Sequence, residues 1–215
     1  AISTGIGTDN IDIVINELDA LVNINFDTRT VNTKKKSLNL IRLGTSGALQ
    51  KNIEVDTFLA SSFGLGFDNV AHFYSETAVI EKEMSRLYTK HASWPKELST
   101  PYIVKASENL FSLFADLPSG ITATAPGFYG PQGRTLRLSP SIVDLHEKIG
   151  SFTTNNHQIT NFEMETSALY YLGQSLGHNT LTICAIIGNR ITKQYSKDYK
   201  KTVEKMIDLV LKRIC

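Results

Sequence analysis

Three segments of the chain share a pattern that suits ligand binding: an apolar stretch, a run of small residues and a lone arginine. They are Arg42–Gly47, Phe128–Arg134 and Gly188–Arg190. Ligands of open α/β sheets bind beyond the carboxyl ends of the strands, so we expect the three segments to meet in one pocket. Because an unpaired buried charge is costly, an arginine in an apolar strand must pair with an anion or a carboxylate. For Arg42 alone, a ligand anion and a structural salt bridge are equally open.

Gln132 and Arg134 lie two residues apart in an irregular loop rich in glycine and proline. They offer an amide and a guanidinium side by side, which matches a planar ligand with adjacent N–H and C=O groups, such as the edge of a pyrimidine. Phe128 offers an aromatic face for the same ring. The alternative for each residue taken singly is a solvated arginine or a packing aromatic, and this is the commoner case.

Glu163 and Glu165 bracket Met164 at the start of a helix that we predict over residues 162–176. A carboxylate in the first turn of a helix can be a simple cap. An ionised carboxylate can also bind a sugar diol, and it stabilises the sugar more strongly once the sugar becomes cationic. Glycoside hydrolysis is less favoured, because its two acids stand about 5 to 9 Å apart across the scissile bond.

The sequence predicts no metal site and no nucleophilic cysteine. Cys184 lies in an apolar strand, and Cys184 with Cys215 makes no disulfide framework. The histidines lack metal-binding spacing, and we interpret all five as surface or structural residues. They are His72, His91, His146, His157 and His178.

Strands and helices that alternate along the chain must position these side chains. Hydrophobic periodicity predicts helices over residues 11–22, 77–91, 162–176 and 198–214, with another that begins at Ser139. Strands are predicted over residues 37–43, 53–66, 100–106, 121–125 and 180–187. This alternation indicates a three-layer α/β domain.

The composition excludes several classes of protein. The 215 residues are 41% hydrophobic and 20% charged, which rules out intrinsic disorder, and the net charge of +1 favours neither nucleic acid nor anionic lipid. The apolar runs are shorter than the ~20 residues that span a bilayer. The chain opens with neither a methionine nor a signal peptide, so we expect that leading residues are missing. Because the two cysteines make no disulfide framework, we expect a cytoplasmic protein.

Four motifs, in this order, together resemble the uridine phosphorylases of the nucleoside phosphorylase superfamily: Arg42–Gln50, Phe128–Arg134, Asn161–Ala168 and Ile187–Arg190. The resemblance covers nearly the whole chain. It implies an α/β, three-layer phosphorylase fold with a central mixed β-sheet flanked by helices. It also implies a single domain over residues 1–215 that lacks the first strands and the Gly-Asp-Pro phosphate loop of the family.

The activity that the resemblance implies is reversible phosphorolysis of uridine to uracil and ribose 1-phosphate, a step of pyrimidine salvage. Arg42, Gln132, Arg134 and Glu165 would be catalytic. As ribose becomes oxocarbenium-like, phosphate attacks its opposite face, while Gln132 and Arg134 stabilise the charge that grows on uracil. The expected contacts are Arg42 and Thr45 with phosphate; Thr45, Met164 and Glu165 with ribose; and Ser46, Gly47, Phe128, Gln132, Arg134, Glu163, Ile187, Gly188 and Arg190 with the base or its pocket.

Other interpretations stay open at this point: a purine nucleoside phosphorylase, a nucleoside hydrolase, or a non-catalytic remnant that binds nucleosides. The purine-cleaving members of the family have an aspartate where this chain has Asn189 and Arg190, which favours a pyrimidine. We expect inorganic phosphate as co-substrate, no metal or cofactor, no nucleic acid or membrane partner, and a homo-oligomer, either a dimer or a hexamer built from dimers.

Overall fold

The helices form where apolar residues recur at helical spacing. The structure is a computed structural model that describes residues 1–214. The first helix buries Ile11 and Ile15, and the last buries Met206 and Val210, which confirms both predicted helices. The α-helices are α1 (Thr8–Asn23), α2 (Lys82–His91), α3 (Glu108–Phe111), α4 (Leu145–Gly150), α5 (Thr166–Ser175) and α6 (Tyr199–Ile214), and short 3₁₀ helices span Val70–Phe73, Ser112–Phe114 and Gly130–Gln132.

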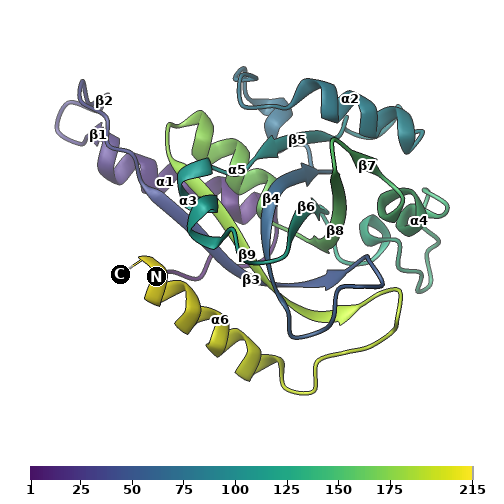
Figure 1. The fold of residues 1–215 in the computed structure, drawn as a ribbon. Coiled ribbons are helices and arrows are strands. Elements are labelled where there is room, and N and C mark those ends of the chain that lie inside the picture. Colours follow the sequence, from purple (N-terminus) through teal and green to yellow (C-terminus); the bar gives the residue numbers. More distant parts are fainter. Residues whose placement is uncertain (215) are drawn as a thin grey trace.

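The strands build a central mixed sheet (Figure 1). Its order is β3-β9-β4-β6-β8-β7, with β5 paired to β4, and β1 and β2 form a separate two-stranded ribbon. Strands β3 and β8 also pair with each other, so five strands close into a ring. The strands are β1 (Ile24–Asn25), β2 (Thr30–Val31), β3 (Asn39–Ala48), β4 (Phe58–Gly66), β5 (Tyr102–Lys105), β6 (Ser119–Thr124), β7 (Thr153–Thr154), β8 (His157–Glu163) and β9 (Asn179–Asn189).

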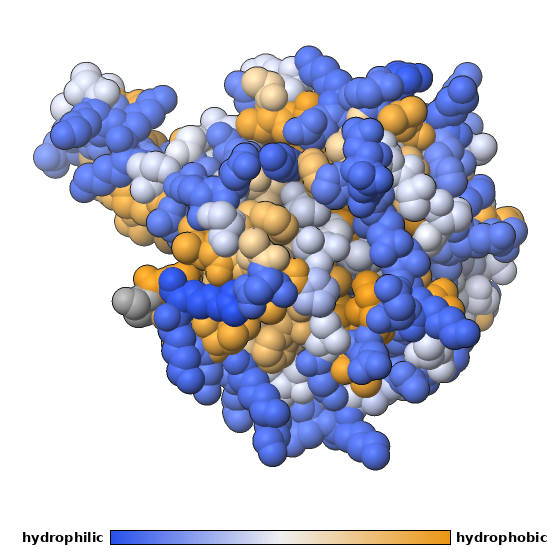
Figure 2. Space-filling model, in the orientation of Figure 1, coloured by the Kyte–Doolittle hydropathy of each residue, from blue (hydrophilic) through white to orange (hydrophobic). Residues whose placement is uncertain are grey.

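Helices flank this sheet, as the predicted α/β fold requires. Helix α5 packs against α1 and β4, while α6 lies along β3 and β9 at the lower left of Figure 1. Helices α2 and α4 lie at the opposite end, beside β5 and β8. In Figure 2 hydrophilic side chains line the outer face of α6, with hydrophobic surface between it and the body of the molecule.

Five predicted boundaries are wrong. The helix predicted over residues 77–91 begins at Lys82, and the strand predicted over residues 53–66 begins at Phe58. Strand β3 does not stop at Gly44 but continues to Ala48, because its backbone pairs with β9 along its whole length. The predicted helix over residues 162–176 begins only at Thr166, since the residues before it form β8 and pair in parallel with β6. The helix predicted from Ser139 begins at Leu145.

None of the helices in residues 1–214 is long and apolar enough to cross a membrane. Cys184 is a buried free thiol. Cys215, the other cysteine, lies outside the described residues.

Candidate active site

The ends of three strands meet at Gly47. This residue pairs with Gly188 on β9 and with Phe162 on β8. The parallel pair β3–β9 and the antiparallel pair β3–β8 therefore bring the three carboxyl-terminal ends together. The structure brings the predicted segments 42–47 and 188–190 together, as we expected from the sequence, and the third segment, 128–134, reaches them through the contact of Gln132 with Arg190. It also places residues 161–163 of β8 beside them.

Arg42, Glu163 and Glu165 form the first group of the site, the carboxylate cluster. Nη1 of Arg42 lies 3.1 Å from Oε2 of Glu163, and Nη2 donates a hydrogen bond to Oε2 of Glu165. The side chains of both glutamates are buried and that of Arg42 nearly so. Of the two alternatives for Arg42, the structure shows the salt bridge, and the contact with phosphate stays a prediction.

Burial and charge oppose each other in this cluster. Burial alone would lower the pKa of Arg42, but the negative groups around it, with Glu163 foremost, raise its pKa above the ordinary value. Burial is also the main reason why the pKa of Glu165 is raised, although the Arg42 charge pulls it down. The guanidinium of Arg42 therefore favours the ionised form of Glu165, and burial opposes it.

Glu163 is a cap for α5. Its Oε1 accepts from the Thr124 hydroxyl at 2.6 Å, and its Oε2 accepts from the backbone N–H groups of Glu165 at 2.9 Å and Thr166 at 3.0 Å. The cap considered for these two glutamates is thus correct for Glu163, and it positions Glu165. Contact of Glu163 with a base is untested and stays a prediction.

Two glycines make room for the carboxylate cluster. The N–H of Gly7 donates to Oε1 of Glu165 at 2.7 Å from a backbone with a φ of 101°, which glycine adopts readily. A Cβ on Gly44 would lie 2.5 Å from Nη1 of Arg42. The guanidinium can therefore lie along β3 only because residue 44 has no side chain. Neither of these contacts was predicted from the sequence.

The second group is the Gln132 cluster, which consists of Gln132, Arg134, Arg190 and His146. Gln132 is 2% exposed, and its Oε1 accepts from Nη1 of Arg134 at 2.6 Å and from Nη2 of Arg190. The Arg134 guanidinium also lies 3.9 Å above the ring of Phe128. The sequence predicted three members of this cluster and missed His146.

The Gln132 cluster carries the positive charge of two arginines. Within residues 1–214, no carboxylate forms a salt bridge with Arg134 or Arg190. Burial and the neighbouring Arg134 lower the pKa of Arg190 to about 10, so it remains a cation at neutral pH. Burial likewise lowers the pKa of Arg134. The cluster suits a flat, electron-rich edge or a ligand that becomes negative.

The two clusters are adjacent. A Cβ on Gly47 would lie 3.2 Å from Nε of Arg190, and the Arg190 guanidinium lies 5.1 Å from the ring centre of Phe162, the residue before Glu163. The carboxylate cluster therefore lies beside the Gln132 cluster where β3, β8 and β9 end.

The remaining predicted residues line these strand ends. Ser46 is buried, and its hydroxyl accepts from the amide of Asn161 at 2.9 Å. Phe128 is half exposed, at 51%. Thr45, Met164 and Ile187 are half-buried, and Gly188 is buried against Tyr195. Their contacts with phosphate, ribose and base stay predictions.

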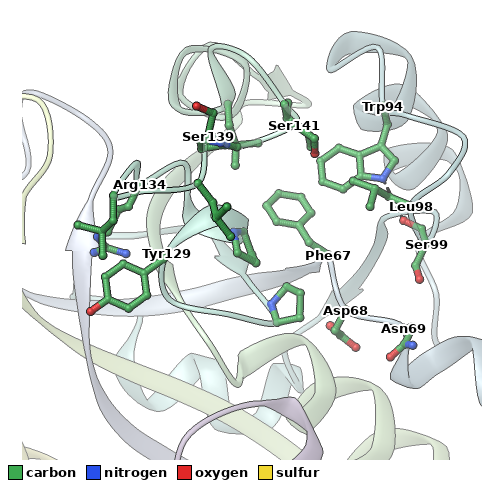
Figure 3. Close-up of a pocket in the computed structure, with 18 of the residues that line it drawn as sticks. Phe67, Asp68, Asn69, Trp94, Leu98, Ser99, Tyr129, Arg134, Ser139 and Ser141 are labelled. Carbon is green, nitrogen blue, oxygen red and sulfur yellow. Dashed lines mark hydrogen bonds between the residues drawn. The ribbon is translucent and has the colours of Figure 1, made fainter.

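A cavity of about 840 Å³ lies apart from the carboxylate cluster (Figure 3). Phe67 and Trp94 form part of its wall, and Arg134 is the one predicted site residue that lines it. We place the chemistry at the strand ends rather than in this cavity, because the buried ion pairs of Arg42 with Glu163 and Glu165 lie there.

The fold and this arrangement of charges at the strand ends define a class of protein. A family model described as the phosphorylase superfamily matches residues 1–214, so the chain belongs to that superfamily. It is 29% identical over 208 residues to a uridine phosphorylase of Thermococcus kodakarensis, covering 93% of this chain and 61% of that relative. It is 25% identical over 211 residues to a DeoD-type purine nucleoside phosphorylase of Bacillus thuringiensis, covering 97% and 72%. The chain thus spans about three fifths of the first relative's length.

Solved structures confirm the phosphorylase fold. A Trypanosoma brucei nucleoside phosphorylase, reported to show uridine phosphorylase activity, superposes with a TM-score of 0.82 at 24% identity, covering 99% of this chain and 78% of that one. A structure from a study of two uridine phosphorylases of Phytophthora capsici gives a TM-score of 0.61 at 21% identity, covering 98% and 72%. At these identities the likeness concerns the fold alone.

Proposed function

We propose that this protein cleaves uridine with inorganic phosphate, in a reversible reaction that yields uracil and ribose 1-phosphate. The observation that carries the proposal is the Gln132 cluster, in which two guanidiniums that pair with none of the described carboxylates converge on one buried carboxamide. A pyrimidine offers adjacent C=O and N–H groups to such a set, and it leaves the sugar as an anion. The carboxylate cluster beside it suits the sugar.

Charge separation explains how the site would lower the barrier. As the glycosidic bond lengthens, ribose gains positive charge near Glu165, and the base gains negative charge near Arg134 and Arg190. Both clusters are held in place before the reaction, so their stabilisation of the transition state needs little reorganisation. Arg42 and Thr45 would hold phosphate on the face of the sugar opposite the base. The proposal needs no metal, cofactor or covalent intermediate.

Asn189 supports a pyrimidine over a purine substrate. Its amide donates to the carbonyls of Gln50 at 2.9 Å and Ile53 at 2.7 Å, and its Oδ1 accepts from the N–H groups of Ile191 at 2.8 Å and Thr192 at 3.0 Å. This side chain is fully used in holding the loop, so it is not free to protonate or bind a purine ring.

The test is to incubate the purified protein with uridine and follow the release of uracil with and without phosphate. We expect release that depends on phosphate, that EDTA does not reduce, and that is faster than the cleavage of inosine. No phosphate-dependent release would refute the proposal. Release without phosphate would indicate a hydrolase, faster cleavage of inosine a purine phosphorylase, and uridine binding without cleavage a non-catalytic remnant.

The proposal extends to a homo-oligomer, a dimer or a hexamer built from dimers, in the cytoplasm, with a role in pyrimidine salvage. Light scattering coupled to gel filtration measures the number of subunits directly. A monomer at assay concentration that still turns over uridine would exclude the oligomer as a requirement.

A further inference from the structure

His146 on α4 belongs to the Gln132 cluster, although no sequence pattern assigns it a role there. Its Nε2 lies 2.6 Å from the carbonyl oxygen of Gln132 and 2.9 Å from Nη1 of Arg190. The same Nη1 donates to the same carbonyl oxygen at 3.1 Å. Polar atoms from three separate segments of the chain therefore meet at one point.

The contact distances favour one of the two tautomers of His146. Arg190 can only donate and the carbonyl of Gln132 can only accept, so Nε2 satisfies one of them at a time. The contact with the carbonyl is the shorter, which favours the tautomer with the proton on Nε2. In that tautomer, His146 and Arg190 hold the same peptide group of Gln132.

The loop is also shaped to fit this imidazole. Gly133 follows Gln132 with a φ of 68°, and a Cβ there would lie 3.1 Å from Nε2 of His146. A glycine thus lets the loop approach α4 closely enough for the hydrogen bond to form. The outer side of His146 lines a cavity of about 450 Å³, together with Asp144 and Glu147 of its own segment. Solvent protons can reach the ring from that side.

We propose that His146 is a positioning residue for the Gln132 cluster, whose neutral imidazole fixes the peptide of Gln132 and keeps the Arg190 guanidinium on the carboxamide. The inference rests on the proposed function for the identity of the ligand, a pyrimidine base. The contacts themselves belong to the protein without ligand. His146 touches no reacting atom and acts through Gln132 and Arg190.

Burial and the positive charges near His146 make its protonation unfavourable. Burial lowers its pKa below 6.5, and Arg190, Arg134 and Lys193 lower it further, whereas the Gln132 carbonyl opposes the shift. At neutral pH the ring is therefore uncharged. As the pH falls through this pKa, a third positive charge appears 2.9 Å from Arg190 and repels its guanidinium. The KM for uridine then rises on the acid side.

Two substitutions separate positioning from plain structural support. In His146→Ala we expect the KM for uridine to rise about tenfold, with kcat within about twofold, because one hydrogen bond next to a charged group is lost. His146→Gln restores the KM to within about threefold, since an amide also donates to the carbonyl. His146→Gln should also lack the rise of KM that we attribute to protonation of His146 between pH 7 and pH 5.

His91→Gln is the matched control. His91 lies on α2, and its Nε2 is 3.0 Å from the carbonyl oxygen of Lys148, which lies on α4 like His146. His91 therefore also holds α4 but lies outside the Gln132 cluster. Its substitution should leave the KM and its pH profile unchanged. The inference is overturned if His146→Ala keeps the wild-type KM, if His146→Ala and His146→Gln are equally impaired, or if the pH profile of His146→Gln superposes on that of the wild type.

NMR of the ¹⁵N-labelled imidazoles distinguishes a failure here from a failure of the proposed function, with His146→Gln assigning the signal. An Nε2–H tautomer that titrates below pH 6.5 supports the contact, even if the protein does not cleave uridine. An Nδ1–H tautomer, or a pKa at or above 6.5, overturns the inference even if uridine is cleaved.

Discussion

Arg42 and Arg190 show two ways in which this chain holds a buried arginine. Arg42 lies between Glu163 and Glu165, so its charge is balanced before any ligand arrives. Arg190 shares the Gln132 carboxamide with Arg134, and its pKa falls to about 10. An anionic ligand therefore gains more electrostatic stabilisation at the Gln132 cluster than at the carboxylate cluster. If phosphate binds Arg42, it must compete with Glu165 for the guanidinium.

Removal of the Arg134 guanidinium tests the predicted contact between Arg134 and the base. We expect Arg134→Ala to lower kcat/KM for uridine at least about tenfold, the size of one charged hydrogen bond. Steady-state rates of uracil release provide the measurement. Arg86→Ala, which removes an exposed arginine of α2 paired with Glu83, should leave kcat/KM unchanged. Equal kcat/KM in Arg134→Ala and the wild type would refute the role of Arg134.

Glu163 should matter for stability as well as for the site. Its substitution by Gln leaves Arg42 with one carboxylate and removes the charge that caps α5, so we expect a loss of about 2 kcal/mol or more in the free energy of unfolding. Urea unfolding followed by circular dichroism gives this value. Glu83→Gln, at an exposed pair, should unfold like the wild type. A Glu163→Gln protein as stable as the wild type would contradict the buried pair.

Part of the site could be predicted from residue types alone. The pairing of Gln132 with Arg134 and the carboxylates at the start of α5 follow from local sequence. Two features could not be predicted: Gly44 as the space for Arg42, and His146 as a contact of Gln132. The first needs the direction of a side chain along a strand, and the second joins residues 14 apart through a loop whose path no local pattern fixes.

At the scale of elements, the secondary structure predicted from local sequence was wrong where strand pairing outweighed local propensity. Residues 44–47 resemble a turn because two are glycines, yet they extend β3, since both β9 and β8 offer hydrogen-bond partners. The end of β8 was predicted as the first turn of a helix, because a short apolar run fits either a strand or a helix. The long amphipathic helices α1 and α6 were predicted closely, since their spacing extends over several turns.

Helix α1 contributes to the site through its first turn. Gly7→Ala forces an alanine into a φ of 101° and places its Cβ 2.7 Å from Oδ1 of Asp9, which should move the N–H away from Glu165. We expect a loss of about 1 kcal/mol or more in unfolding free energy and a higher KM for uridine. Thermal unfolding and steady-state kinetics measure the two effects.

Gly177→Ala is the control for backbone strain. Gly177 has a φ of 85° and follows α5 at the far end from Glu165, and a Cβ there would meet no atom of residues 1–214 within 4 Å. This variant should lose similar stability with an unchanged KM. If Gly7→Ala and Gly177→Ala have the same KM, the contact between Gly7 and Glu165 has no bearing on the site.

At the scale of the whole molecule, the closed ring of five strands removes two exposed sheet edges. The pairing of β3 with β8 is short, but the N–H of Leu49 extends it with a hydrogen bond of 2.8 Å to the carbonyl of Thr160. Both clusters lie where this ring closes. Opening the ring would therefore separate the residues of the site.

Hydrogen exchange tests whether the ring opens by itself. We expect the amide of Leu49 to exchange only through global unfolding, with the same free energy of opening as the amide of Ile186 in β9. The ribbon β1–β2, which lies outside the ring, should exchange faster. Exchange of Leu49 well before Ile186 would show that β3 and β8 part without unfolding the rest.

The cavity beside the site contains a natural optical label. Trp94 is the single tryptophan of the chain; it lines the cavity, stacks on Phe67 at 4.7 Å, and donates its indole N–H to the carbonyl of Ser99. Its emission therefore comes from one known place. A compound that fills the cavity changes the polarity around that indole, and a fluorimeter records the change without a dye or a mutation.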